Sequence, residues 1–261
     1  MGIQSASLNV MRAAAEKAGR ALRRDFGEIE KLQVSQKGPG DFVTNADLKA
    51  ESIIRDELQT ARPGYGLLME ESGEVEGSDK THRWIVDPLD GTTNFMHGIP
   101  HFAISIALER EGRLVSGLIY NPVTDELFLA ERGQGAFSHN TRLRVGGRSR
   151  MSDAVFACGA PHGERTGRNE FITEMETLLP KVAGIRRFGA AALDLAYVAA
   201  GRVDGFWERG LAPWDMAAGI VICREAGGLV SDTKNGSKFF ETGEVVAANE
   251  ALHGDLLKNL A

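Results

Sequence analysis

The sequence predicts a protein of mixed structure, with an α+β first half followed by an α/β second half. Apolar residues recur at helical spacing in two early segments, and short strands joined by short turns fill residues 84–131. After about residue 140, strands and helices alternate, which indicates a layered α/β arrangement. We therefore expect an N-terminal α+β domain over residues 1–140 and a C-terminal domain over 141–261.

The first half begins with helices and continues as a sheet. Apolar positions repeat every three or four residues over 8–26 and again over 46–58, where Pro63-Gly64 ends the second helix. A loop is expected between them, at Lys37-Gly38-Pro39-Gly40. The stretches FAISIALE, LVSGLIY and ELFLAE indicate strands, and the short turns between them favour antiparallel pairing.

The second half alternates strands with helices. Strands are expected at AVFACGA, IRRF, VDGFWE, GLVSD and VVAAN. Helices are expected at about 168–179, at AAALDLAYVAAG, at about 215–226 and at the end of the chain.

Composition excludes some classes of partner. The formal net charge is −6 over 261 residues, so nothing suggests direct nucleic-acid binding. No apolar run reaches 18 residues, so no membrane span is expected. Cys158 and Cys223 lie in apolar runs, which indicates buried thiols and a cytoplasmic protein.

The stretch WIVDPLDGTTNF, residues 84–95, combines groups that conflict unless a cation joins them. Gly91 and Thr92 follow a buried strand at a possible helix start, where free backbone N–H groups favour a phosphate. Asp87 and Asp90 beside them would repel a phosphate. A divalent cation such as Mg²⁺, which prefers oxygen ligands, would bind both the carboxylates and the phosphate. The alternative is an ordinary turn, since Asp-Gly is common in turns.

Other carboxylates also lie at the ends of expected elements. Glu70 follows a short apolar run, Asp215 opens an apolar helix, and Asp47 lies at the start of another helix. Each has a structural alternative. Asp215 would serve only as an N-cap, Asp47 would complete a capping box with Thr44, and Glu70 would form a solvated pair with Glu71.

Taken together, WIVDPLDGTTNF, the upstream MEES and the downstream PWDMAAGIVICREAGG resemble the inositol monophosphatase family, and within it the SuhB-type bacterial members. The resemblance runs from GPGDFVTNAD to VVAANEALH. It implies a two-domain, layered α-β-α-β-α sandwich of the inositol monophosphatase and fructose-1,6-bisphosphatase type. It also implies Mg²⁺-dependent hydrolysis of inositol monophosphate by a metal-activated water, with two or three Mg²⁺ per site, and a homodimer.

The resemblance assigns roles to individual positions. The implied metal ligands are Glu70, Asp87, the Leu89 carbonyl, Asp90 and Asp215. Catalytic roles fall to Glu70, Thr92 and Asp47. The implied substrate contacts are Asp90, Gly91, Thr92, Gly189, Ala190, Ala191, Glu208 and Asp215. Many family members have Thr or Ser where this chain has Ala190, so polyol contact there must come from backbone or water. Arg186 and Arg187, beside this segment, are expected either to favour an anionic substrate or to bridge to a second subunit.

Two rival functions stay open. The same scaffold serves broader sugar-phosphate phosphatases of the fructose-1,6-bisphosphatase kind, as well as nucleotide 3′-phosphatases and histidinol phosphatases, although DGTTNF favours the inositol type. SuhB-type proteins also act as RNA polymerase partners in antitermination, so this chain could be such a partner with catalysis secondary.

Overall fold

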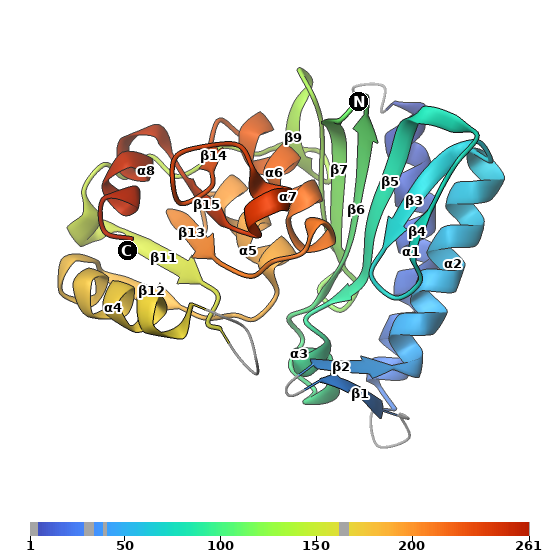
Figure 1. Ribbon diagram of the computed structural model, residues 1–261, viewed down its shortest axis with the longest axis horizontal. Coiled ribbons are helices and arrows are strands. Elements are labelled where there is room, and N and C mark those ends of the chain that lie inside the picture. Colours follow the sequence, from blue (N-terminus) through green and yellow to red (C-terminus); the bar gives the residue numbers. More distant parts are fainter. Residues whose placement is uncertain (1–4, 29–33, 39–40, 162–166, 261) are drawn as a thin grey trace.

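The computed structural model describes residues 5–28, 34–38, 41–161 and 167–260, and it has five layers (Figure 1). Two long helices cover one face of a large sheet, two more helices fill the space between that sheet and a smaller one, and a last pair covers the smaller sheet. The helices, in layer order, are α1 (Ala6–Phe26) and α2 (Asn45–Ala61), then α5 (Ala191–Ala199) and α6 (Pro213–Glu225), then α4 (Arg168–Leu178) and α8 (Glu250–Leu257). The predicted layered α-β-α-β-α fold is confirmed.

The large sheet has eight strands in the order β10-β9-β8-β7-β6-β5-β3-β4. All neighbouring pairs are antiparallel except β3 with β5. Its strands are β3 (Tyr65–Met69), β4 (Gly73–Val75), β5 (Asp79–Asp90), β6 (Ala103–Arg110), β7 (Arg113–Asn121), β8 (Glu126–Glu131), β9 (Gly135–Ser138) and β10 (Thr141–Arg142).

Both faces of this sheet are buried, as the uninterrupted apolar run in β5 requires. Trp84 and Val86 pack with α1 and α2, whereas Ile85 between them packs with α5 and α6. Successive side chains of a strand point to opposite faces, so one strand contributes to two cores. The helices on each side therefore hold β5 in a fixed position, and the residues that follow Val86 start from a rigid support.

The smaller sheet has five strands in the order β12-β11-β13-β15-β14. The strands are β11 (Val155–Cys158), β12 (Gly184–Arg186), β13 (Gly205–Glu208), β14 (Leu229–Ser231) and β15 (Val245–Ala248). β11 pairs in parallel with β12 and β13, while β15 is antiparallel to its neighbours β13 and β14. The alternation of strands and helices was thus predicted, but the sheet is mixed.

Some elements differ from the sequence-based expectation. The prediction of a loop at residues 37–40 is wrong in part, because β1 (Val34–Gly38) pairs antiparallel with β2 (Asp41–Thr44). Residues 39–40 lie outside the described part of the chain. The short helices α3 (Thr92–Met96) and α7 (Phe239–Thr242) and the 3₁₀ turns η2 (Met151–Asp153) and η3 (Leu179–Lys181) complete the structure. The large sheet ends at Arg142, and the domain division near residue 140 stays a prediction.

Two expectations from composition can be compared with the structure. Cys158 and Cys223 are both buried and unpaired, as predicted. Among the helices described, none combines the length and the apolar character needed to cross a membrane.

Candidate active site

The sequence DPLD forms a bulge at the end of β5. Asp87 pairs with Ser105 of β6 and Asp90 pairs with Ala103, so β5 has one more residue than β6 between these two pairs. Pro88 lies in the bulge, where its missing N–H is not needed by the ladder. The Leu89 backbone N–H donates to Asp87 Oδ1 at 2.8 Å. Bulges redirect side chains, and this one lets two aspartates of one strand serve the same site.

Gly91 turns the chain from β5 into α3. Its φ is 96°, a left-handed conformation that favours glycine. A Cβ at this position would lie 3.1 Å from the His101 carbonyl oxygen and 3.3 Å from Ala190 Cβ. Two segments about a hundred residues apart in sequence therefore meet at this glycine, and Thr92 begins α3 directly beside them.

Glu70 reaches the site from the neighbouring parallel strand. It follows β3, and its backbone N–H donates to the Val86 carbonyl at 3.2 Å, which places it beside Asp87. Burial raises the pKa of Asp87 well above its usual value, and the charges of Glu70, Asp90 and Asp215 raise it further. The structure thus brings Glu70, Asp87, Asp90 and Asp215 into one electrostatic neighbourhood.

Asp215 comes from the second half of the chain, at the third residue of α6. Its Oδ2 accepts the N–H of Ala212 at 2.7 Å, as the third residue of a capping box does. The N-cap position itself is occupied by Ala212, so the structural alternative of Asp215 as the N-cap is wrong. Ser105 Oγ donates to the Trp214 carbonyl at 3.1 Å. Because Ser105 pairs with Asp87 across the sheet, this bond fixes the start of α6 against the strand that carries Asp87.

Asp90 connects the same strand to α5. Its Oδ2 accepts the Ala192 N–H at 2.7 Å. The pKa of Asp90 is raised well above its usual value, mainly by burial and then by the negative charge of Asp215. The charges of Glu208 and Glu70 raise it further, whereas the hydrogen bond from Ala192 lowers it. Negative charges from both halves of the chain therefore act on Asp90.

Asp47 completes the capping box that was weighed for it from sequence and also lies beside Thr92, while its catalytic role stays a prediction. One of its carboxylate oxygens, Oδ2, accepts the Thr44 N–H at 2.9 Å and completes the capping box of α2. The other, Oδ1, lies 3.0 Å from Thr92 Oγ1, which is also 3.1 Å from the Leu89 carbonyl oxygen. Burial raises the pKa of Asp47, although these hydrogen bonds oppose the shift. The residue that caps α2 therefore also orients the Thr92 hydroxyl, which lies beside the Leu89 carbonyl.

The expected substrate-binding residues occupy different environments. Glu208 ends β13 and its carboxylate lies over Gly159, where a Cβ would meet Glu208 Cδ at 1.8 Å. Gly189 has a φ of 90° and lies against the guanidinium of Arg187. Arg186 is exposed and donates to the Ile185 carbonyl at 3.0 Å, so its predicted substrate contact stays a prediction.

Ala190 and Ala191 both have buried side chains at the start of α5. The Ala190 methyl lies beside Gly91, 3.3 Å from where a Cβ at that glycine would stand. An alanine side chain has no polar atom, and the expectation that polyol contact here comes from backbone or water stays a prediction.

Asn94 is a site residue that the sequence analysis did not single out. Its Nδ2 donates to the His101 carbonyl at 2.7 Å and to the Phe188 carbonyl at 2.8 Å, so it joins the α3 loop to the segment before α5. The sequence could have indicated Asn94, because this residue lies within the motif DGTTNF. Ser105 had no such signal, because its role depends on its hydrogen bond to the Trp214 carbonyl, which lies far away in sequence.

The set of metal ligands expected from sequence fits a hard divalent cation. It consists of carboxylates and one backbone carbonyl, the ligands that Mg²⁺ prefers, and their mutual repulsion would be relieved by positive charge. Within the described ranges, no three His, Cys, Asp or Glu side chains are arranged to hold a metal ion as they stand. Each N–H bond to Asp87, Asp90 or Asp215 engages one of about four lone-pair sites per carboxylate, so the chemistry of the set still suits a cation.

The five-layer fold, with acidic side chains gathered from both halves of the chain, is of the inositol monophosphatase and fructose-1,6-bisphosphatase type. The chain belongs to the inositol monophosphatase family, whose model matches residues 4–261. A relative from Mesorhizobium japonicum described as inositol-1-monophosphatase is 61% identical over 255 residues, covering 98% of this chain and 96% of its own.

Two further relatives belong to the SuhB group. The Nus factor SuhB of Escherichia coli is 45% identical over 253 residues, covering 97% of this chain and 95% of its own. The solved structure of the extragenic suppressor protein SuhB from Bartonella henselae is 57% identical, covers 98% of each chain and superimposes with a TM-score of 0.95. The resemblance inferred from sequence motifs is confirmed.

Proposed function

We propose that this protein hydrolyses inositol monophosphate to inositol and phosphate, with Mg²⁺ as its cofactor. The main supporting observation is that carboxylates from the end of β3, from β5, from the start of α6 and from the end of β13 act on one another's ionisation. Gathering these carboxylates, of which Asp87 is buried and the others are half-buried, is unfavourable unless they take up protons or bind cations. Bound Mg²⁺ would relieve their repulsion. Family membership and a 61% identical relative described as inositol-1-monophosphatase support the same reaction.

The residues proposed to hold Mg²⁺ are Glu70, Asp87, Asp90, Asp215 and the Leu89 carbonyl. Bound there, Mg²⁺ would neutralise phosphate charge, lower the pKa of a water molecule and favour departure of the alkoxide. How many ions act, two or three, belongs to this proposal.

The chain's own residues would orient water and substrate. Thr92 Oγ1 has one proton, and donation to Asp47 Oδ1 leaves its lone pairs directed elsewhere. Thr92 would then accept a hydrogen bond from the attacking water, and Glu70 would take the proton that the water loses. Gly91 and Thr92 offer backbone N–H groups to the phosphate, and Glu208 accepts hydrogen bonds from inositol hydroxyls.

The decisive experiment measures phosphate release from inositol 1-phosphate with Mg²⁺, with EDTA, and after Mg²⁺ is restored. We expect activity only with Mg²⁺, and a loss of at least a hundredfold in Asp90→Asn, because an amide cannot supply the negative charge. Asp153→Asn is the matched control, since Asp153 is exposed on η2. Full Mg²⁺-dependent turnover in Asp90→Asn would contradict the assignment.

Breadth of specificity is tested with the same assay. Equal kcat/KM values for inositol 1-phosphate and fructose 1,6-bisphosphate would show a broad sugar-phosphate phosphatase instead. We expect a preference for the inositol ester, because the role proposed for Glu208 is to accept hydrogen bonds from inositol hydroxyls.

A role as an RNA polymerase partner in antitermination is a second candidate function, supported by 45% identity to a protein described as Nus factor SuhB. Co-purification with RNA polymerase that survives Asp87→Asn would show a binding role separable from catalysis. The predicted homodimer and cytoplasmic location are part of the same proposal, and light scattering of the purified protein tests the dimer.

A further inference from the structure

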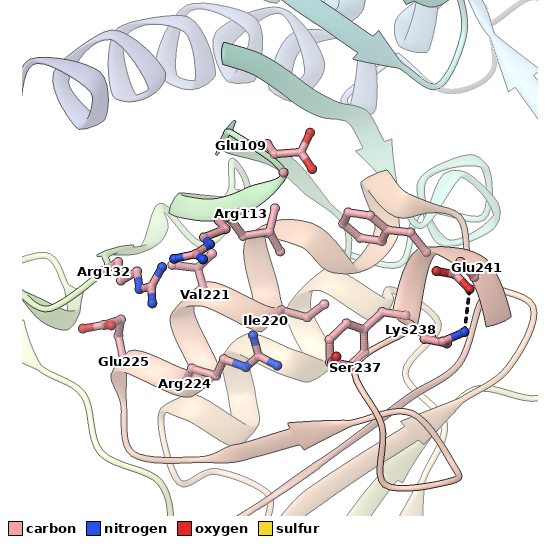
Figure 2. Close-up of a pocket in the computed structure, with 14 residues that line it drawn as sticks. Glu109, Arg113, Arg132, Ile220, Val221, Arg224, Glu225, Ser237, Lys238 and Glu241 are labelled. Carbon is pink, nitrogen blue, oxygen red and sulfur yellow. Dashed lines mark ion pairs between the residues drawn. The ribbon is translucent and has the colours of Figure 1, made fainter. Parts of the chain in front are cut away.

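A groove lies away from the acidic site, between the β6–β7 turn, the C-terminal half of α6 and the short helix α7 (Figure 2). Its volume is about 520 Å³, within the range of small-molecule sites. Arg224, on its wall, lies nine residues after Asp215 on α6, which corresponds to about 13 Å along the helix axis. The groove is therefore a separate site at the other end of the helix that carries Asp215.

Three arginines line this groove, and Figure 2 shows their guanidinium groups on one side of it. Arg113 and Arg132 make no side-chain hydrogen bond or ion pair with any other part of the chain that the structure describes. Their strands adjoin, because the Arg132 N–H donates to the Val115 carbonyl at 2.9 Å. Partial burial lowers the pKa of Arg224, and the nearby charge of Arg132 contributes to this shift. Like charges are thus held close together.

The carboxylates of the groove are already engaged. Glu225 accepts the Gly133 N–H at 2.9 Å and the Gly135 N–H at 2.8 Å. Glu109 pairs with Arg83, outside the groove, at 2.8 Å, and Glu241 pairs with Lys238 at 3.3 Å. The three arginines are therefore left without a carboxylate partner from these residues. Guanidinium groups bind phosphate-like anions through paired N–H donors, which makes this an anion-binding arrangement.

The same groove has an apolar wall. Arg224 lies over the ring of Phe239, with 5.1 Å between its guanidinium carbon and the ring centroid. The half-buried side chains of Leu114 and Phe240 extend the apolar surface beside it. An inorganic ion would use only the arginines, whereas an organic anion would also cover these side chains and bury more apolar area.

We propose that this groove binds a small organic dianion, a phosphate or phosphonate joined to a flat apolar group. The anion contacts Arg113, Arg132 and Arg224, and the apolar group lies against Leu114 and Phe240. The site is independent of the acidic site, so binding needs no divalent cation.

Calorimetric titration with phenylphosphonate in EDTA tests the proposal, since this dianion is not hydrolysed. Methylphosphonate presents the anion without the ring, and benzyl alcohol presents a ring without the anion. We expect saturable binding of phenylphosphonate and at least fivefold weaker binding of each of the others. Equal binding of methylphosphonate would overturn the apolar part of the proposal, and absence of phenylphosphonate binding would overturn all of it.

Variants locate the site. Arg132→Gln should weaken phenylphosphonate binding at least fivefold, and Arg113→Gln should act similarly. Arg20→Gln, an exposed position on α1, should bind within twofold of the unchanged protein. Asp90→Asn should also bind normally, because its carboxylate belongs to the other site. Unchanged binding in the Arg113→Gln/Arg132→Gln double variant would overturn the location. No hydrolysis is measured, so either result leaves the proposed phosphatase activity untouched.

Discussion

Replacing Gly159 by alanine should displace the Glu208 carboxylate without disturbing the fold. A Cβ at Gly159 would lie 1.8 Å from Glu208 Cδ, 2.0 Å from Oε2 and 2.2 Å from Oε1. The three nearest atoms thus all belong to the far end of one flexible side chain. Reaching ordinary contact, about 3.5 Å between carbons, moves the carboxylate by about 1.7 Å. A hydrogen bond does not survive such a shift.

The expected loss follows from the proposed role of Glu208. A hydrogen bond to a charged group contributes about 1.5–3 kcal/mol, so kcat/KM for inositol 1-phosphate should fall about 10- to 150-fold. Phenyl phosphate has no polyol hydroxyls, and its kcat/KM should change less than about threefold, since it makes no such hydrogen bond. Steady-state phosphate release with both esters measures the difference.

Two comparisons make this test specific. Glu208→Gln should show the same selective loss, and the double variant should lose little more, because both changes remove one interaction. Gly254→Ala on α8 is the matched glycine control, since nothing lies within 4 Å of its added Cβ. Equal losses with both esters in a folded Gly159→Ala protein, or no loss with inositol 1-phosphate, would refute the reasoning.

Two further predictions concern a hydroxyl and a buried imidazole. Thr92→Val keeps the shape of the side chain but removes the hydroxyl that Asp47 orients, so kcat should fall about a hundredfold or more, while Thr93→Val at an exposed neighbouring position should not change it. Steady-state kinetics checks this, and an unchanged kcat in Thr92→Val would exclude a role for that hydroxyl. Burial lowers the pKa of His101 to about 4, so the folded protein keeps this imidazole neutral while the unfolded chain takes up a proton below pH 6.5. Stability should therefore fall between pH 6.5 and about 4, by up to about 3 kcal/mol from this group, and His101→Phe should flatten that slope in urea unfolding. An equal slope in both proteins would contradict the neutral state of His101.

Local chemistry explains why much of this protein can be predicted from its sequence. The caps, the turns and the apolar periodicity act between residues a few positions apart, so α2 and α6 were located to within about two residues. The motif DPLDGTT is also local, since one bulge and one left-handed glycine place its groups. The strands β1, β2, β4, β9 and β10 were not predicted, because each is short and depends on pairing with a neighbour.

The tertiary structure decided which distant groups meet. The acidic character of Glu70 and Asp215 is plain in the sequence, but only the parallel pairing of β3 with β5 and the packing of α6 against the sheet bring them to Asp87. The same holds for Arg113 and Arg224, whose grouping follows from the β6–β7 turn lying beside the end of α6. Local conformation depends on neighbouring residues, whereas contacts between segments far apart in sequence depend on how the layers bury their apolar faces against one another. The sequence by itself therefore determined the chemistry of the reacting groups, and the packing of the layers determined where they assemble.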